Sequence, residues 1–433
     1  MKKALKVYKF GGLSLKDAEA IKNVYNILKT HPNERLIVVV SAFAKVTDAL
    51  ENLVAAHMRN DGSSDAYFDI IKKRHFEVID DLFDGEVNIK PEVQSVLDDI
   101  QFQLDKHRDK GYDLIYDQVV SRGEILSSVI VSAYFNAQGL KSNWVDARKI
   151  VITDDIYREG WVQWDETTKN AHGLIAPLLD NGGVVITQGF IGSATNGYTT
   201  TLGREGSDYT AAILSYCLDA ESMTIWKDVP GILTADPKLF DNITKLDLIS
   251  YREAIEMTYY GAKVIHPKTI KPLQNKSIPM LVKSFLNPEG EGTYISDEVE
   301  DHYPPIVALE KEQALVQIST RDFSFVAEHH ISEIFQHIAD LRLQVNMMQN
   351  SAISFSVCFN DVDDKVDRFA ENMERKFKVT LIRGLELITV RHYNETTVES
   401  LKSGKMLLLE ERLRNTMQMV VKNVPVIERR RGS

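Results

Sequence analysis

The sequence contains little cysteine and no long apolar run. Its 433 residues include two cysteines, Cys217 and Cys358, which lie far apart inside apolar segments, so a disulfide framework is excluded in practice. No segment reaches the ~20 apolar residues that a membrane-spanning helix needs. Lys6 and Lys9 interrupt the apolar residues near the N-terminus, which argues against a signal peptide. We therefore expect a cytoplasmic protein with reduced, buried thiols.

Positive charge is also scarce. The chain has 51 Lys and Arg residues against 62 Asp and Glu residues, a net charge of −11. Nucleic acids and anionic membranes both favour a basic face, so no partner of either kind is expected. An enzyme for anionic substrates would have to gather its Lys and Arg residues locally. The length predicts two or three domains.

Two common nucleotide-binding motifs are missing as well. The sequence has no G-x-x-x-x-G-K-[ST] segment, which argues against a P-loop site. The first predicted strand is not followed by G-x-G-x-x-G, which argues against a Rossmann dehydrogenase.

Up to about residue 295, β-branched runs alternate with helical patterns, which predicts helices packed on a largely parallel sheet. Residues 50–118 are mostly amphipathic helix and carry no chemical motif. A short strand is predicted at Val7–Phe10, and strands buried on both faces are predicted at Leu36–Val40, Val184–Thr187 and Met223–Trp226. One face of a helix is formed by Ala18, Ile21, Val24, Ile27 and Leu28.

The pattern changes after Asn287–Gly292 and Pro304-Pro305, which indicate a domain boundary. Two successive βαββ-type units of about 60 residues follow, a plausible pair of ligand-binding or dimerising modules. The first has strands at Ala314–Thr320 and near 343–349 and 352–359, with helices around 331–341 and 366–373. The second has strands at Leu385–His392, 405–411 and 416–422, with a helix near 395–402.

Residues suited to anions follow several predicted strands. In Lys9-Phe10-Gly11-Gly12, backbone amides without a neighbouring Cβ can approach an anion beside a lysine, although a Gly pair also makes a tight turn. Ser41–Thr47 follows the next buried strand; its hydroxyls either face a ligand or cap a helix. In Val120–Glu124, a carboxylate near a helix start either binds an ammonium group or complements the helix dipole.

The most specific segment is Thr201–Ala212. Two glycines frame Arg204, and Ser207-Asp208 opens a helix whose N-terminus can receive an anion. The guanidinium of Arg204 could clamp a carboxylate with two hydrogen bonds. Acidic and basic residues are interleaved in Trp226–Lys238, and a lysine follows a small-residue turn in Tyr260–Pro267.

Taken together and in this order, these segments resemble the aspartate kinases of the amino-acid kinase superfamily. The Gly pair alone would also fit glutamate, acetylglutamate or uridylate kinases. The segments LGREGSDYTAA, KDVPGILTADP and YGAKVIHP are the ones that point to aspartate as acceptor. The resemblance implies a three-layer α/β fold with a mainly parallel central sheet, ATP and Mg²⁺ as cofactors and L-aspartate as substrate. It also implies a catalytic domain at 1–295, followed by two α+β ACT-like regulatory modules at 296–375 and 376–433.

The same resemblance implies roles for individual residues. Lys9 and Asp208 would be catalytic, Lys9 on the phosphates and Asp208 orienting it. The nucleotide would be bound by Lys9, Gly11, Gly12, Lys227, Asp228, Leu233, Lys238, Lys263 and Val264. Aspartate would be held by Ser41, Thr47, Glu124, Arg204 and Ser207, with Glu124 on its ammonium group and Arg204 on its α-carboxylate.

Several residues depart from the family pattern. Leu13 stands where a threonine usually follows the Gly pair, Leu233 replaces an aromatic residue, and Glu205 takes a glycine's place beside Arg204, with which it could pair. These departures are the basis of an alternative, a catalytically weak amino-acid sensor on the same fold. Lys9, Glu124, Arg204 and Asp208 are all kept, so the active enzyme is preferred.

The regulatory modules of this family bind an end-product amino acid and mediate dimerisation. We therefore expect lysine or threonine as effector, and a homodimer or a dimer of dimers. The effector residues would be His329, His330, Ile331, Asn346, Asn350 and Ser351. Two adjacent histidines at a helix start are expected to point apart, which argues against a metal site there.

Overall fold

The computed structural model describes residues 4–31, 34–85, 87–262, 265–297, 302–322, 324–361 and 364–424. The chain forms two compact units. The first comprises residues 1–232, 245–255 and 265–300, and the second comprises 233–244, 256–264 and 301–433. In the part of the chain that the structure describes, no helix combines the length and apolar character needed to cross a bilayer.

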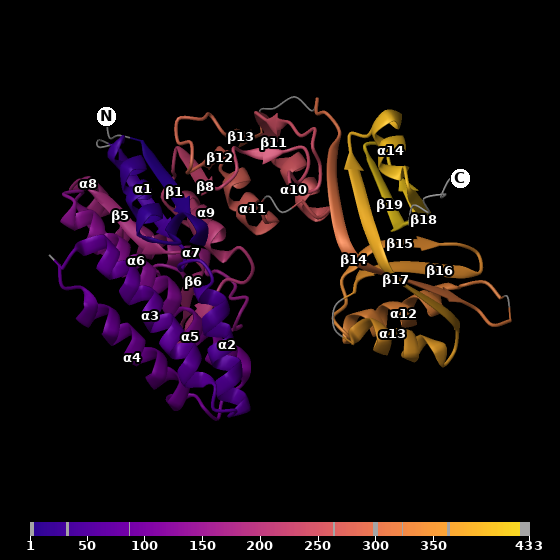
Figure 1. Cartoon of the computed structure of the whole chain (residues 1–433), viewed down its shortest axis with the longest axis horizontal. Helices are drawn as coiled ribbons and strands as arrows, with labels where there is room; N and C mark the ends of the chain where they lie inside the picture. Colours follow the sequence, from indigo (N-terminus) through magenta and orange to yellow (C-terminus); the bar gives the residue numbers. More distant parts are fainter. Residues whose placement is uncertain are drawn as a thin grey trace, which may run out of the picture. The chain divides into compact units, whose positions relative to one another are not determined.

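The first unit is built on an eight-stranded sheet (Figure 1). All of its strand pairs are parallel except that of β12 with β13, which confirms the predicted fold class. In sheet order the strands are β11 (Leu248–Ser250), β13 (Thr293–Ser296), β12 (Met280–Ser284), β8 (Ser222–Lys227), β1 (Leu5–Phe10), β2 (Arg35–Val40), β5 (Val184–Gln188) and β3 (Ser142–Val145).

Helices cover both faces of this sheet. Tyr8 and Phe10 of β1 join one large buried core with residues of the first six helices. Successive side chains of a strand point to opposite faces, and Lys9 between them reaches the helix α9, so α9 covers the other face. The helices of this part of the chain are η1 (Gly12–Leu15), α1 (Ala18–Lys29), α2 (Val46–Arg59), α3 (Ser64–Phe83), α4 (Lys90–Lys106), α5 (Tyr112–Val120), α6 (Arg122–Ala137), η2 (Ala147–Lys149), α7 (Trp164–Leu174), α8 (Ala176–Asp180), α9 (Gly206–Cys217), α10 (Tyr251–Tyr259) and α11 (Pro267–Asn275).

Two smaller sheets accompany the main one. A three-stranded sheet contains β4 (Ile152–Thr153), β6 (Ile191–Ala194) and β7 (Thr199–Thr201). A two-stranded ribbon contains β9 (Ile232–Leu233) and β10 (Lys245–Leu246). Strand β7 leads directly into the loop that carries Arg204, so this sheet helps to position a predicted site residue.

The second unit holds one six-stranded antiparallel sheet in the order β15-β16-β14-β17-β19-β18. Its two βαββ halves meet where β14 pairs with β17. The elements are β14 (Ile306–Ser319), α12 (Glu328–Asp340), β15 (Val345–Asn350), β16 (Ser354–Asn360), α13 (Lys365–Glu374), β17 (Lys378–Arg391), α14 (Glu395–Lys402), β18 (Lys405–Arg412) and β19 (Thr416–Asn423). Helices α12 and α13 pack on the first half of the sheet and α14 on the second (Figure 1).

Strands β14 and β17 both begin about seven residues earlier than the sequence pattern predicts. The cause is a pair of irregularities. Glu312 has a left-handed backbone (φ 54°) where the β14–β17 register shifts, and Gly384 (φ 68°) lies on the facing strand. A β-bulge of this kind breaks the period-2 alternation of apolar residues that marks a strand. The domain limits 296–375 and 376–433 stay a prediction.

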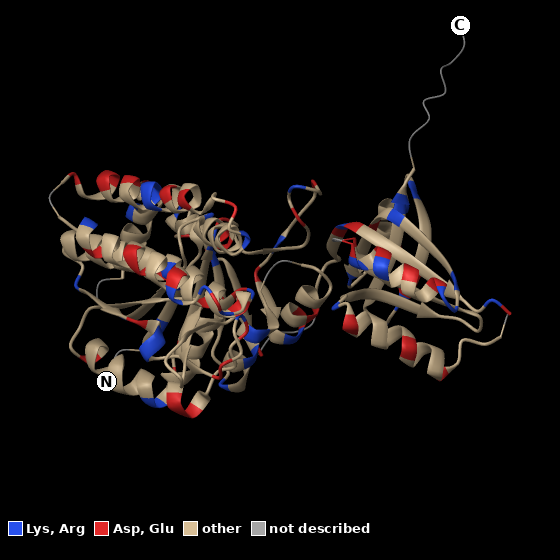
Figure 2. Cartoon of the chain, turned by 90° about the horizontal axis from the view of Figure 1, so that it is seen from below, with Lys and Arg blue, Asp and Glu red and all other residues tan. Residues whose placement is uncertain are grey.

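Figure 2 shows acidic and basic residues interspersed along the helices. The local gathering of cations that an anionic substrate requires is therefore sought at the ends of the parallel strands, where open α/β sheets bind ligands.

Candidate active site

The predicted catalytic pair is formed. Lys9 lies near the carboxyl end of β1 and Asp208 in the first turn of α9, and Nζ of Lys9 is 2.6 Å from Oδ1 of Asp208. Their side chains are 11% and 5% exposed. Oδ1 of Asp208 accepts no hydrogen bond among the described residues, so this short ion pair is what stabilises its charge. A lysine held in this way presents its cation at the end of the sheet with little freedom to move.

Both glycines of the following turn make close approaches. A Cβ on Gly11 would lie 3.4 Å from Nζ of Lys9, so the backbone of this turn runs beside the amine. A Cβ on Gly12 would lie 3.0 Å from the carbonyl oxygen of Ala42, which is tighter than most real Cβ contacts. Gly12 therefore lets the turn after β1 pack against the loop after β2. The two loops that follow these neighbouring strands form one surface.

Glu124 lies in the first turn of α6 and is buried. Burial raises the pKa of its carboxyl group to about 8, although the backbone amide of Ala42 and the charge of Lys9 act in the opposite direction. Its Oε2 has no hydrogen-bond partner among the described residues. A residue that served only the helix dipole would not need to be buried with one oxygen unpaired. The arrangement fits a carboxylate that awaits a cationic group, such as the ammonium group of an amino acid.

Three further residues predicted to hold aspartate lie on the first unit. Ser41 follows β2; its N–H donates to the carbonyl oxygen of Phe10, and its own carbonyl accepts from Oγ of Ser127 at 2.7 Å. Thr47 is half-buried in the first turn of α2. Ser207 is buried in the first turn of α9, where a Cβ on Gly189 would come within 2.4 Å of its Cβ.

Gly189 is a residue that sequence reasoning missed. It follows β5, and its lack of a side chain allows the N-terminus of α9, with Ser207 and Asp208, to approach the strand ends. The available signal was a glycine directly after a buried apolar strand, the same signal that singled out Gly11 and Gly12.

Arg204 is exposed, two residues before α9 begins, and has no ion pair among the described residues. The sequence suggested that Arg204 could pair with its neighbour Glu205, but the two side chains do not form an ion pair. Oε2 of Glu205 instead accepts a hydrogen bond from the backbone N–H of His266 at 2.8 Å. The guanidinium therefore has its donors available for a carboxylate.

The residues predicted to bind the nucleotide are divided between the two units, so we describe each by itself. Lys227 ends β8 and is half-buried, and Asp228 after it is exposed. Leu233 is half-buried in β9, and Lys238 is exposed, with its backbone N–H bonded to Oδ1 of Asp236 at 2.8 Å. Lys263 and Val264 lie outside the described residues.

The predicted effector residues lie on α12 and on the β15–β16 hairpin. The rings of His329 and His330 were expected to point apart. That prediction was wrong, because the two rings contact each other with centroids 3.9 Å apart. His330 also accepts from the N–H of Ala327 through Nδ1 and packs on Phe377, because capping the first turn of α12 fixes its rotamer. Ile331 is half-buried against the apolar core between α12, α13 and the six-stranded sheet.

Asn346 takes part in an amide network inside the sheet. Its Nδ2 donates to Oε1 of the buried Gln313 at 2.8 Å and to Oδ1 of Asn360 at 2.9 Å. Both amide protons are thus used, which leaves Oδ1 as the group that could accept from a ligand. Asn350 is exposed at the end of β15, and Ser351 bonds across the turn to Ser354.

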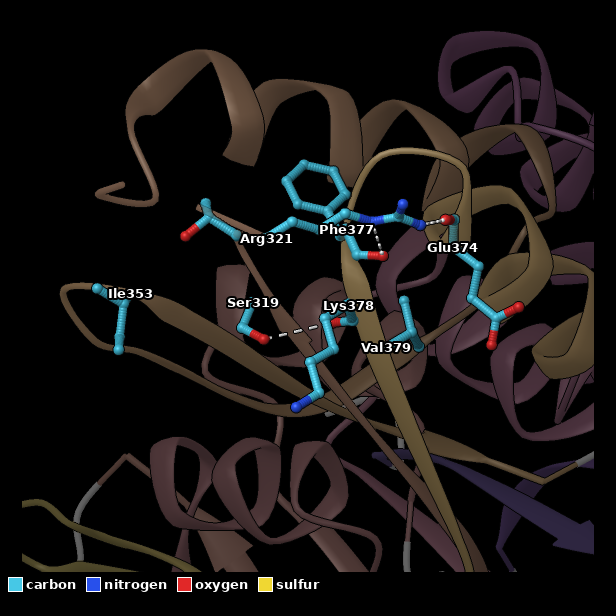
Figure 3. Close-up of a pocket in the computed structure, with 8 residues that line it drawn as sticks. Ser319, Arg321, Ile353, Glu374, Phe377, Lys378 and Val379 are labelled. Atoms are coloured by element: carbon cyan, nitrogen blue, oxygen red, sulfur yellow. Dashed lines mark hydrogen bonds between the residues drawn. The ribbon is translucent and has the colours of Figure 1, made fainter. Parts of the chain in front are cut away.

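A cavity of about 600 Å³ lies at this end of the sheet (Figure 3). Arg321 lines it and donates to the carbonyl oxygens of Phe377 and Glu374. None of the predicted effector residues lines the cavity, but His330 packs on Phe377, which does. The cavity therefore lies directly beside the predicted effector segment.

The geometry can be compared with known proteins. The profile of the amino acid kinase family matches residues 4–284. Lysine-sensitive aspartokinase 3 of Escherichia coli is 33% identical over 354 residues, which cover 81% of this chain and 77% of that protein. The chain spans 42% of the length of another relative, the chloroplastic bifunctional aspartokinase/homoserine dehydrogenase 2 of Arabidopsis thaliana, at 30% identity over 87% of this chain.

Two solved structures match nearly the whole length of the chain. E. coli aspartokinase III in complex with lysine and aspartate superposes with a TM-score of 0.82, and the same enzyme in complex with aspartate and ADP with 0.81. Both are 28% identical in sequence, and the match covers 96% of each chain.

Proposed function

Because this chain belongs to the amino acid kinase family, and within it to the aspartokinases, we propose that it transfers the γ-phosphoryl group of ATP to the β-carboxylate of L-aspartate. The products are 4-phospho-L-aspartate and ADP. The observation that carries the proposal is the site at the strand ends of the first unit. There the ion pair of Lys9 and Asp208, the turn of Gly11 and Gly12 and the buried carboxylate of Glu124 lie on adjoining segments.

The chemistry asks little of the protein beyond position and charge. The β-carboxylate of aspartate is already ionised near neutral pH, so no general base is needed. Lys9 places a cation, and the Gly11 and Gly12 amides place dipoles, where negative charge on the transferred group must be stabilised. Asp208 holds the amine of Lys9 in place through the 2.6 Å ion pair. Substrate binding supplies the rest of the rate enhancement by holding the carboxylate in line with the phosphoryl group.

The substrate is oriented by its other two charged groups. Glu124 takes the α-ammonium group, whose donors would satisfy the unpaired Oε2. Arg204 takes the α-carboxylate, because its guanidinium is exposed and has no ion pair among the described residues. With both ends held, the β-carboxylate is the group left to face the nucleotide. L-glutamate, one methylene longer, would carry its side-chain carboxylate past this position.

Mg²⁺ would enter with ATP. The described residues include no cluster of three His, Cys, Asp or Glu side chains that could hold a metal ion by themselves. Mg²⁺ commonly binds through one or two carboxylates together with substrate phosphates, and the carboxylate of Asp208 lies 2.6 Å from the amine of Lys9. When bound, the ion neutralises phosphate charge.

We further propose that an amino acid, lysine or threonine, regulates the enzyme through the second unit. The support is the available Oδ1 of Asn346 and the cavity beside His330. One E. coli relative is named as lysine-sensitive, and a similar solved structure is a complex with lysine. Both favour lysine as the effector. A ligand that binds only the folded state raises the unfolding temperature. Lysine should therefore raise it in a thermal-shift assay more than methionine does, and Asn346→Leu should remove the difference.

We also propose a cytoplasmic homodimer or dimer of dimers. Within the described residues, β15 and β18 are the edges of the six-stranded sheet, and exposed edges are ready places for a second copy to pair.

The activity is tested by coupling ADP release to NADH oxidation with L-aspartate, L-glutamate or UMP as acceptor. The proposal expects ADP release with L-aspartate and MgATP and none above background with the other two. The absence of aspartate-dependent ADP release would favour the catalytically weak sensor instead. Release with glutamate or UMP at a comparable rate would indicate a different acceptor.

A further inference from the structure

The loop that carries Arg204 has an unusual backbone. Gly203 (φ 76°) and Glu205 (φ 55°) both have left-handed conformations. Such a conformation is easy for glycine but strained for a residue with a Cβ. The loop cannot relax freely, because a Cβ on Gly206 would lie 2.7 Å from Cδ2 of Phe190. Glu205 therefore occupies a position better suited to glycine, and something must hold it there.

The side chain of Glu205 provides the hold on the α9 side of the loop. Its Oε2 accepts the N–H of His266 at 2.8 Å. His266 is itself fixed, because its Nδ1 accepts the N–H of Lys268 and caps the start of α11. Burial lowers the pKa of His266, which keeps Nδ1 unprotonated and able to accept. Glu205 thus ties the loop to the N-terminus of a packed helix.

Asp117 provides the hold on the β7 side. It is buried in α5, and its Oδ2 accepts the N–H groups of Thr201 and Arg158, each at 2.9 Å. Its Oδ1 accepts the hydroxyl of Thr201 at 2.7 Å. Thr201 ends β7, three residues before Arg204. Thr201 is therefore bound to one buried carboxylate by two hydrogen bonds, one from its backbone N–H and one from its hydroxyl group.

We propose that Asp117 and Glu205 are positioning residues, which fix both ends of the Arg204 loop so that its guanidinium meets the α-carboxylate of aspartate. This inference rests on the proposed function. It explains how this chain accommodates a glutamate at a position that favours glycine: the hydrogen bond of Glu205 to His266 offsets the backbone strain. The same bond keeps the Glu205 carboxylate from competing with the substrate for the neighbouring guanidinium.

The chain offers a matched control for Asp117. Gln118 is the next residue of α5, is also buried, and binds both backbone groups of Thr199 at the other end of β7. Gln118→Glu removes the group that donates to the carbonyl oxygen of Thr199. In the same way, Asp117→Asn replaces an oxygen that accepts from Thr201. Both changes are isosteric and both affect β7. Only Asp117 lies next to the loop, so the two variants separate positioning from general stability.

Glu205 has its own series of variants. Glu205→Gln keeps an acceptor oxygen, Glu205→Ala loses it and keeps the strain, and Glu205→Gly loses it and relieves the strain. KM for aspartate, KM for ATP, kcat and the unfolding temperature are measured for each. We expect Asp117→Asn and Glu205→Ala to raise KM for aspartate roughly tenfold or more, since a displaced binding group commonly costs that much. KM for ATP and kcat at saturating aspartate should change less than twofold.

Glu205→Gln should have a KM for aspartate near the wild-type value. Gln118→Glu should lower the unfolding temperature but leave KM for aspartate unchanged. Glu205→Gly should have a raised KM for aspartate but unfold at a higher temperature than Glu205→Ala. If Asp117→Asn and Glu205→Ala change KM for aspartate no more than Gln118→Glu does, or raise both KM values equally, the inference is wrong. Lack of aspartate-dependent turnover in the wild type would instead overturn the proposed function, and this inference with it.

Discussion

The buried carboxyl group of Glu124 makes aspartate binding depend on pH. Its pKa is raised to about 8 by burial, so below that pH the free enzyme carries mostly the neutral acid. An ammonium group binds the ionised form, so each binding event near neutral pH must release a proton. The apparent affinity is reduced by the fraction of enzyme that is competent. With a pKa of about 8, this fraction is about a tenth at pH 7 and about a hundredth at pH 6.

KM for aspartate should accordingly fall about tenfold for each pH unit between roughly pH 6 and pH 8, and level off above the pKa. KM for ATP should not follow this profile. Calorimetry at pH 7 in two buffers of different ionisation enthalpy should show nearly one proton released per aspartate bound. In Glu124→Gln the profile should be flat, with KM for aspartate roughly tenfold to a hundredfold above wild type at pH 8.5, because a charge-assisted hydrogen bond is lost. A wild-type KM that stays constant over this range, or a mutant with the same slope, would refute the reasoning.

The raised pKa of Glu124 also makes stability depend on pH. Raising the pH should strengthen aspartate binding but lower the stability of the unliganded protein. The pKa of Glu124 is higher in the folded protein than in the unfolded chain, so the folded state is favoured while the group is protonated. That stability is full below the unfolded pKa and is lost as pH rises towards about 8. Above this pH the unliganded wild type buries a charge that Glu124→Gln does not. The mutant should therefore unfold at a higher temperature than wild type at pH 8.5, and at a similar one at pH 5. A mutant less stable than wild type at both pH values would contradict this assignment.

Three further predictions concern single contacts. Lys9→Met should lower kcat by about a hundredfold or more, while Lys6→Met, on the same strand but paired with Glu34, should keep near-normal turnover; equal losses in both would show a general effect on β1. Gly12→Ala places a Cβ 3.0 Å from the loop after β2 and should raise KM for aspartate several-fold in steady-state assays; an unchanged KM would mean that the loop yields freely. Asp99→Ala removes the half-exposed carboxylate that lies 2.8 Å from the buried guanidinium of Arg122 and should cost about 2 kcal/mol in denaturant unfolding, less than for a fully buried pair, so a loss below roughly 0.5 kcal/mol would show that water replaces the carboxylate.

Much of the first unit could be predicted from the sequence. Leu36–Val40 and Val184–Thr187 are continuous apolar runs, as strands buried on both faces must be, and both lie in strands with a neighbour on each side in the sheet. Residues at the carboxyl ends of such strands were candidates for the site, whereas the pairing of Lys9 with Asp208 was expected from the resemblance to the aspartate kinases. The carboxyl ends of parallel strands meet at one edge of the sheet, so the predicted strands already indicate where site residues gather.

Contacts that depend on side-chain direction or on distant segments were not predictable. The hydrogen bond of Glu205 to His266 joins residues 61 positions apart, whereas adjacency favoured an ion pair of Glu205 with Arg204. The contact between the rings of His329 and His330 arises because Nδ1 of His330 caps the helix, which sets a rotamer that spacing alone does not reveal. The early starts of β14 and β17 were hidden by an irregularity at Glu312, where the alternation of apolar residues is broken.

The most direct test of the central claim is to identify the product. An acyl phosphate reacts with hydroxylamine to give a hydroxamate, which forms a coloured iron complex, whereas ATP hydrolysis gives none. With MgATP, L-aspartate and hydroxylamine, the wild-type chain should form aspartyl hydroxamate in a one-to-one ratio with ADP, and Lys9→Met should form almost none. ADP without hydroxamate, or hydroxamate formed equally by both proteins, would contradict phosphoryl transfer at this site.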